Sequence, residues 1–144
     1  MEINFTVWGE PFGKLNMRPM NIAGHASAFN PKQNVSYMQR VKDSLFSALG
    51  EIDGPIGEVA FRVEIKAFFK IPKSTAKRKS AQMLEGKIKP TKKPDLDNIS
   101  KVILDAVTMS GAVWRDDSQV AYETLQKEYS ERPRVEVSIK EMDS

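Results

Sequence analysis

Cysteine is absent from this chain of 144 residues, and His25 is its only histidine. The lack of cysteine excludes a disulfide scaffold, a thiolate metal site and a cysteine nucleophile. Because only one histidine is present, a bound metal would have to be held mainly by oxygen atoms, which are the ligands of hard cations. His25 stands alone among turn residues, and we expect it to be a solvated loop side chain.

Long apolar runs are missing as well. No stretch approaches the roughly 20 apolar residues that a membrane-spanning helix needs. The segment 1–8 is too short for a signal peptide and contains no basic residue. We therefore expect a cytoplasmic protein that has no membrane partner.

Three glycine-containing motifs are also absent. The sequence has no Gly-x4-Gly-Lys-Ser/Thr loop and no Gly-x-Gly-x-x-Gly fingerprint, the motifs that hold the phosphates of nucleotides. It has no Gly-x-Ser-x-Gly elbow, which carries the nucleophile of many serine hydrolases. We therefore expect neither a nucleotide cofactor nor serine hydrolase chemistry.

Positive charge is concentrated in one part of the chain. Residues 70–94 carry nine basic side chains and one acidic one, a net charge of +8, whereas the remaining residues carry a net charge of −5. Such a block favours contact with a polyanion, and with DNA the contact would be to phosphates. A solvated lysine-rich loop is the alternative interpretation. The residues expected at phosphates are Lys77, Arg78, Lys79, Lys92 and Lys93.

The apolar pattern predicts a small, two-layer α+β domain over residues 1–144, with helices packed on one face of a mixed sheet. Strand-like alternation is found over 3–8, 58–69, 119–128 and 134–141, with a short extended piece over 25–29. Helical spacing is found over 34–49, 76–85 and 96–109. We expect Ser74 and Asp95 to be the N-caps of the last two helices.

Acidic side chains gather around the last predicted helix. Asp95 and Asp97 lie at its start, Lys101 follows four residues after Asp97, and Asp116 and Asp117 precede the next strand. The helix is about 21 Å long at ~1.5 Å per residue. The return segment can span up to ~27 Å, so Asp117 can reach Asp95 and Asp97. Converging carboxylates repel one another unless a hard cation lies between them, and Mg²⁺ suits such a set.

This constellation predicts metal-assisted hydrolysis of a phosphodiester. The cation would polarise the phosphoryl oxygen and lower the pKa of a bound water, a carboxylate would orient that water, and Lys101 would stabilise the developing negative charge. The structural alternative is that Asp95 is only a cap and Asp116-Asp117 only a turn. We expect Asp105 either to pair with Lys101 or to support the metal ligands indirectly.

Aromatic residues offer a second route to DNA. Phe68, Phe69 and Trp114 could stack on the exposed bases of a branched DNA. All three lie in apolar runs, however, and this placement favours packing in the core.

Residues 92–120 resemble the signature of the RusA family of Holliday junction resolvases. The matching motifs, in order, are Lys93-Pro94-Asp95-Leu96-Asp97-Asn98-Ile99-Ser100-Lys101, Leu104-Asp105-Ala106 and Trp114-Arg115-Asp116-Asp117-Ser118-Gln119-Val120. Gly13-Lys14 with Arg18-Pro19 is similar to a basic element of the same family.

The resemblance implies a homodimeric, Mg²⁺-dependent endodeoxyribonuclease, with Mn²⁺ as a substitute. Such an enzyme nicks four-way DNA junctions symmetrically during recombination and repair, and it is often encoded by phages or prophages. By position, Asp95, Asp97 and Asp117 would be the catalytic metal ligands and Lys101 the functional lysine. Lys14 and Arg18 would contact DNA.

Two other functions stay open at this point. One is a non-catalytic DNA-binding protein that assists recombination, in which the aspartates are only caps. The other is a Mg²⁺ nuclease with little selectivity for branched DNA.

Overall fold

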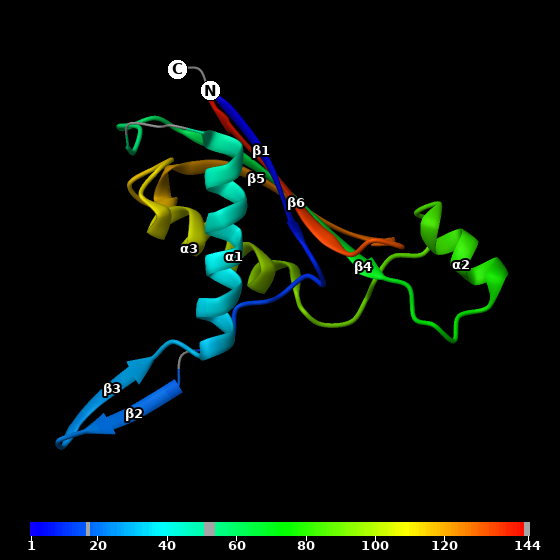
Figure 1. Cartoon of the computed structure of the whole chain (residues 1–144), viewed down its shortest axis with the longest axis horizontal. Helices are drawn as coiled ribbons and strands as arrows, with labels where there is room; N and C mark the ends of the chain where they lie inside the picture. The colour runs from blue at the N-terminus through cyan, green and yellow to red at the C-terminus, as the bar shows by residue number, and fades with distance from the viewer. Residues whose placement is uncertain (17, 51–53, 143–144) are drawn as a thin grey trace.

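The computed structural model describes residues 1–16, 18–50 and 54–142 (Figure 1). Its helices and strands follow one another along the chain as β1 (Glu2–Trp8), β2 (Arg18–Ile22), β3 (His25–Phe29), α1 (Lys32–Leu49), β4 (Phe61–Lys70), α2 (Lys77–Leu84), α3 (Leu96–Ser110), the short 3₁₀ helix η1 (Asp117–Gln119), β5 (Val120–Ser130) and β6 (Arg134–Glu141).

Four strands form one mixed sheet in the order β1-β6-β4-β5. The β4 and β5 strands are parallel, because the crossover between them contains α2 and α3, whereas β6 is antiparallel to both of its neighbours. Along β4 the side chains alternate between buried and exposed, and those of Phe61, Val63, Ile65 and Ala67 are fully or almost fully buried. The alternation predicted for this segment is confirmed, with the strand starting three residues later than expected.

Helices α1 and α3 cover one face of this sheet and contact each other (Figure 1). Their apolar sides and the facing strand residues form a single buried cluster. Trp114 belongs to it, with its ring edge-on to Phe61 at 5.5 Å between centroids and its indole N–H donating to Thr108 Oγ1 at 2.7 Å. The two-layer α+β prediction is confirmed, and Trp114 is a core residue.

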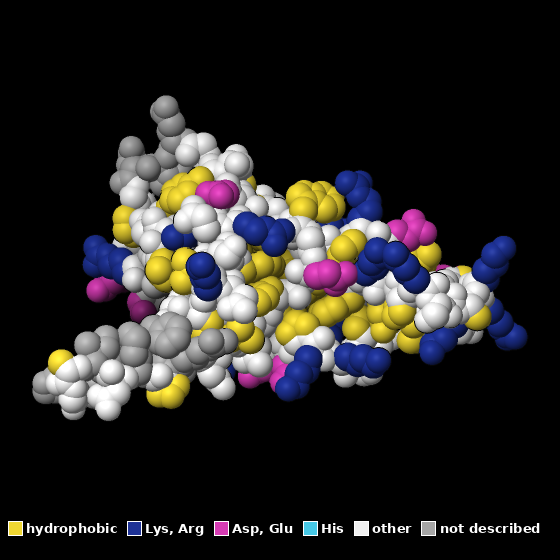
Figure 2. Space-filling model, turned by 60° about the horizontal axis from the view of Figure 1, so that its bottom comes forward, with side chains coloured by type: hydrophobic (Ala, Val, Ile, Leu, Met, Phe, Trp, Pro, Cys, Tyr) yellow, Lys and Arg dark blue, Asp and Glu magenta, His cyan; other side chains and the backbone are white. Residues whose placement is uncertain are grey.

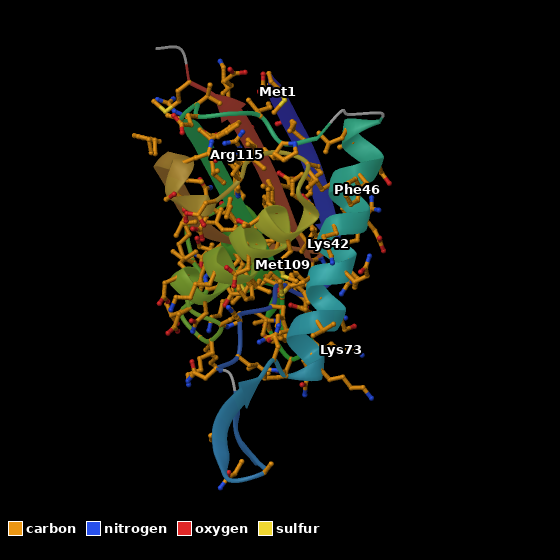
Figure 3. The ribbon with its side chains drawn as sticks, turned by 90° about the vertical axis from the view of Figure 1, so that its left-hand side faces the viewer. Met1, Lys42, Phe46, Lys73, Met109 and Arg115 are labelled. Atoms are coloured by element: carbon orange, nitrogen blue, oxygen red, sulfur yellow. The ribbon has the colours of Figure 1, made fainter. Side chains whose placement is uncertain are left out.

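Two elements project from this body at opposite ends. The β2–β3 hairpin extends beyond the first residues of α1 (Figures 1 and 3), and α2 lies past the ends of β4 and β5 (Figure 1). β2 was not predicted from the sequence. The prediction that Ser74 caps α2 is wrong. Ser74 lies in a turn closed by the Thr75 N–H and the Pro72 carbonyl at 3.1 Å, and Ala76 holds the N-cap position without a side-chain bond.

None of the helices in the described ranges combines the length and the apolar character needed to cross a bilayer.

Candidate active site

The site begins at the first turn of α3. Asp95 holds the N-cap position in an extended conformation, but its side chain makes no capping hydrogen bond. Its backbone carbonyl accepts the Ile99 N–H at 3.1 Å, so the helix starts without help from the carboxylate. The side chain is exposed at a helix end where the macrodipole favours negative charge. The carboxylate is therefore free to bind a ligand.

One turn further on, Asp97 and Lys101 form an exposed ion pair with an N–O distance of 3.8 Å. Exposed pairs of this kind contribute about 0–1 kcal/mol, so neither side chain is locked by the other. The pairing has the favourable order on a helix, with the acid four residues before the base. For this reason Lys101 pairs with Asp97, and the expectation that it pairs with Asp105 is wrong.

Asp105 instead accepts a hydrogen bond from the Lys14 ammonium, and both side chains are partly buried. Lys14 comes from the loop that follows β1, so this ion pair joins the loop to the second half of α3. The prediction that Lys14 contacts DNA stays a prediction, and its charge is already partnered by a carboxylate.

The same loop forms one wall of a hollow of about 450 Å³ beside Asp95. Residues 11–16 line one side, and Lys93, Pro94, Asp95 and Asn98 line the other. The loop approaches so closely that a Cβ on Gly13 would lie 2.6 Å from Pro94 Cβ and 3.1 Å from Asn98 Cβ. The Lys14 N–H donates to the Asn98 carbonyl at 2.8 Å. Only a glycine at position 13 allows this contact without a shift of the loop or of the Lys93-Pro94 segment.

Helix α1 holds the loop from its other side through Asn34, which is fully buried. Its Oδ1 accepts the Leu15 N–H at 2.8 Å, and its Nδ2 donates to the Leu15 carbonyl at 2.9 Å and to Asn30 Oδ1 at 2.8 Å. The side chain thus pairs with the Leu15 backbone as a neighbouring strand would. Sequence reasoning missed Asn34, although a signal existed, because Asn34 falls on the same helix side as the buried residues Met38, Val41 and Leu45.

The second acidic pair lies at the start of η1, which contacts α3. Asp116 caps this turn by accepting the Ser118 N–H at 3.1 Å, and the Gln119 side chain completes a capping box. Hydrogen bonds with Ser118 lower the pKa of Asp116 below its ordinary value. Asp117 is exposed, and within the described ranges its carboxylate makes no hydrogen bond or ion pair. Of the two, Asp117 is the one available to a ligand.

Oxygen donors at the start of α3 suit a hard cation. Mg²⁺ is usually bound by one or two carboxylates together with waters and phosphate oxygens, and Asp95 and Asp97 supply exposed carboxylates of this kind. Across residues 1–16, 18–50 and 54–142, no three acidic or histidine side chains are close enough to hold one ion together. The convergence of Asp117 with Asp95 and Asp97 therefore stays a prediction, as does the metal.

The predicted phosphate contacts lie in two places, on α2 and on the segment that leads into α3. Lys77, Arg78 and Lys79 are exposed on α2, and Figure 2 shows Lys and Arg side chains around that end of the molecule. Lys92 and Lys93 are exposed on the segment that leads into α3, and Lys93 lines the hollow beside Asp95.

Two predictions fall on the projecting hairpin. Arg18 is the first residue of β2, and His25 is the first residue of β3, directly after the turn. His25 thus lies in a strand and not in a loop. The side chains of Arg18 and His25 lie outside the described part of the structure, so their roles stay predictions.

Phe68 and Phe69 are half-buried and each carries a cation on its ring. The Arg134 guanidinium lies 3.9 Å from the Phe68 ring centroid, and the Lys127 ammonium lies 5.3 Å from that of Phe69. A base could stack on these rings only if the cations moved.

Exposed carboxylates at the start of α3, preceded by exposed lysines, suit a ligand that contains phosphates and a hard cation. The model of the family "Endodeoxyribonuclease RusA" matches residues 9–140, nearly the whole chain. The chain is also 34% identical over 146 residues to the uncharacterized protein YqaN of Bacillus subtilis (strain 168), an alignment that covers 99% of this chain and 98% of YqaN. The chain belongs to the RusA endodeoxyribonuclease family. Membership supports the activity of a nuclease, a hydrolase of DNA phosphodiester bonds.

Proposed function

We propose that this protein is a Mg²⁺-dependent endonuclease that resolves four-way DNA junctions by paired, symmetric nicks during recombination and repair. The observation that carries the proposal is the Asp95 carboxylate. It stands at the N-cap of α3 and caps nothing, and Asp95 lines a hollow together with Lys93. A purely structural aspartate at this position would bond to the helix that follows it.

Asp95 and Asp97 would hold the metal, and Asp117 would join them from the start of η1. When bound, Mg²⁺ supplies charge that polarises a phosphoryl oxygen and lowers the pKa of a water molecule. A carboxylate of the set orients the attacking water. Lys101 stabilises the negative charge that develops on the phosphate, because its pairing with Asp97 is long and exposed and so leaves the ammonium free to turn.

We further propose that the protein acts as a homodimer on branched DNA in a bacterial or phage-infected cell. A four-way junction has two-fold symmetry, so two nicks at related positions require two related active sites. Lys77, Arg78, Lys79, Lys92 and Lys93 would contact the phosphates of the junction arms.

Cleavage of a synthetic junction tests this proposal. The purified full-length protein is incubated with end-labelled four-way junctions and Mg²⁺, and the nicked strands are resolved on a denaturing gel. We expect paired nicks that are lost in Asp95→Asn and Asp117→Asn and are unchanged in Asp43→Asn. Asp43 is a matched control, because it is an exposed aspartate on α1 whose carboxylate accepts only the Gln39 amide at 2.9 Å.

Other outcomes identify the alternatives. Junction binding that persists in EDTA, with no cleavage under any metal, would indicate a DNA-binding accessory protein. Similar cleavage rates on linear duplex, flaps and junctions would indicate a nuclease without junction selectivity.

A further inference from the structure

A second basic region lies outside the block that the charge count identifies. From Pro11 to Lys42 the chain contains no acidic residue and five basic ones. This segment forms the loop beside Asp95, the β2–β3 hairpin and the first part of α1. Its five cations are spread over 32 residues, so this region is less densely charged than the block over residues 70–94.

Within this segment the structure contains a hollow of about 500 Å³ on α1, which we name the α1 hollow. Its lining residues are Phe12, Lys32, Gln33, Ser36, Tyr37 and Arg40. Phe12 stacks on Tyr37, with ring centroids 5.2 Å apart. Phe12 also lines the hollow beside Asp95, so the two hollows share a residue and adjoin each other. A strand lying at Asp95 can therefore continue into the α1 hollow.

The charges of the α1 hollow suit an anion. Lys32 and Arg40 are exposed, and within the described ranges neither has a carboxylate within 4.0 Å. Burial raises the pKa of Tyr37 to about 12, so its phenol carries no negative charge at neutral pH.

Arg40 is also held in place. It donates to the Trp8 carbonyl, and its guanidinium lies 5.5 Å from the Tyr37 ring centroid. A guanidinium has five N–H donors in a fixed fork, so most of them remain for a phosphate. An arginine ordered in advance loses less conformational freedom when it binds.

One hollow on the open face of the sheet has the opposite character. Its volume is about 370 Å³, and it is lined by Glu2, Glu64 and Glu136, with Lys66 as the one cation among its lining residues. This hollow is a poor site for a polyanion, in contrast to the α1 hollow, whose lining residues include two cations and no carboxylate.

We infer that the α1 hollow is a second contact site for DNA, where Lys32 and Arg40 bind a backbone phosphate of the strand that continues from the Asp95 hollow. The sugar of that nucleotide lies against Phe12, which stacks on the buried Tyr37 ring. The inference rests on the proposed function, since it takes DNA as the ligand of the Asp95 hollow. It adds a site on α1 that the basic block over residues 70–94 does not contain.

Salt-dependent binding tests the inference. The affinity of the full-length protein for a labelled four-way junction is measured by fluorescence anisotropy at several salt concentrations, without Mg²⁺. Each lost phosphate contact lowers the slope of log K against log salt by about 0.9. We therefore expect the double variant Lys32→Gln/Arg40→Gln, which removes both cations from one phosphate, to lower the slope by about 0.9 per protomer.

The matched control is Lys42→Gln/Lys66→Gln, which removes the same charge from outside the α1 hollow. We expect it to leave the slope near that of the wild type. Equal slopes for the two double variants would overturn the inference. A wild-type protein that binds no DNA overturns it together with the proposed function, whereas binding without cleavage under Mg²⁺ overturns only the nuclease.

A direct mapping experiment exploits the lack of cysteine. An iron chelate attached to Ser36→Cys stands in the α1 hollow, and one attached to Ser47→Cys stands about three turns further along the same helix. Both serines are exposed. We expect the first probe, without Mg²⁺, to cut junction DNA at a defined position and the second to cut none. Equal cutting by both probes, or no cutting by the first, contradicts the inference.

Discussion

Two aspartates stand immediately before helices in this protein, and the chain uses them in opposite ways. Asp116 precedes η1, and its carboxylate is engaged in a capping box with Ser118 and Gln119. Asp95 precedes α3 and lines a hollow, and its carboxylate caps nothing. The same residue type at the same helical position is structural in one case and available for chemistry in the other. Its use depends on what the surrounding chain brings to it.

At Asp95 the surrounding chain is the loop over 11–16. It is held from behind by Asn34 of α1 and from the side by Asn98 and Asp105 of α3. At the start of η1, by contrast, the hydrogen-bond partners of Asp116 are Ser118 and Gln119, which follow it within three residues. The Asp95 carboxylate therefore makes no capping hydrogen bond in a site built from distant segments, whereas the Asp116 carboxylate is hydrogen-bonded in a turn built from neighbouring residues.

The largest expected effect comes from removing the charge at Asp95. Asp95→Asn should lower the rate of junction cleavage by about 100-fold or more, because a charge that acts on the transition state is lost. It should leave the denaturation midpoint near the wild-type value, since the carboxylate makes no capping bond. Cleavage assays and urea unfolding of the same preparation check both parts. A large loss of stability in this variant would show that Asp95 is structural after all.

Asn34→Ala tests what holds the loop. It leaves the N–H and carbonyl of Leu15 without their partner and opens a cavity at a fully buried position. We expect the free energy of unfolding to fall by about 3 kcal/mol. Urea unfolding measures the change.

The control for Asn34 is Asn4→Ala, which alters an exposed asparagine on β1. This change should stay within about 0.5 kcal/mol of the wild type. If Asn34→Ala behaved like Asn4→Ala, the loop would be held by other contacts.

Gly13→Ala tests the close approach of the loop to α3. The new methyl group would meet Pro94 Cβ at 2.6 Å, and the proline ring cannot turn away as a flexible side chain would. We expect a loss of about 1–3 kcal/mol, together with weaker junction binding as the wall of the hollow shifts. Gly57→Ala is the matched control, because nothing lies within 4 Å of a Cβ at that position. Equal unfolding curves for the two variants would contradict a tight contact at Gly13.

Asp116→Asn should have the smallest effect, a slight fall in melting temperature with cleavage retained. The lowered pKa of Asp116 sets the pH dependence. The stability that the charged carboxylate contributes is present above its ordinary pKa and is lost as the pH falls through the lowered value. The difference between wild type and variant in thermal unfolding should therefore shrink in acid. A difference that stays constant with pH would mean that the capping box does not depend on the charge.

Much of the site could be predicted from local sequence. Asp95, Asp97 and Lys101 lie within seven residues of one another, so a helix start is enough to place them on adjacent turns. In the same way, the spacing of apolar residues predicted strand β4 and helices α1 and α3. The RusA-like motifs lie in this locally determined part of the chain, between Lys93 and Val120.

Other parts of the site depend on contacts between distant residues. Asn34 could not be distinguished from other polar helix residues until Leu15, 19 positions earlier, was seen beside it. The Lys14–Asp105 pair joins residues 91 positions apart, and no periodicity links them. The prediction that paired Asp105 with Lys101 was wrong because it considered only neighbours on one helix.

By itself, the sequence determined the α+β class, the acidic start of α3 and the basic block over 70–94, because each depends on the order and spacing of nearby residues. Only the tertiary structure decided which carboxylate is free, which glycine must lack a side chain, and that the cations of α1 line a hollow that shares Phe12 with the Asp95 hollow. The physical reason is that packing and hydrogen bonding join segments far apart in the chain, and a partner found in this way determines whether a polar group is engaged or available.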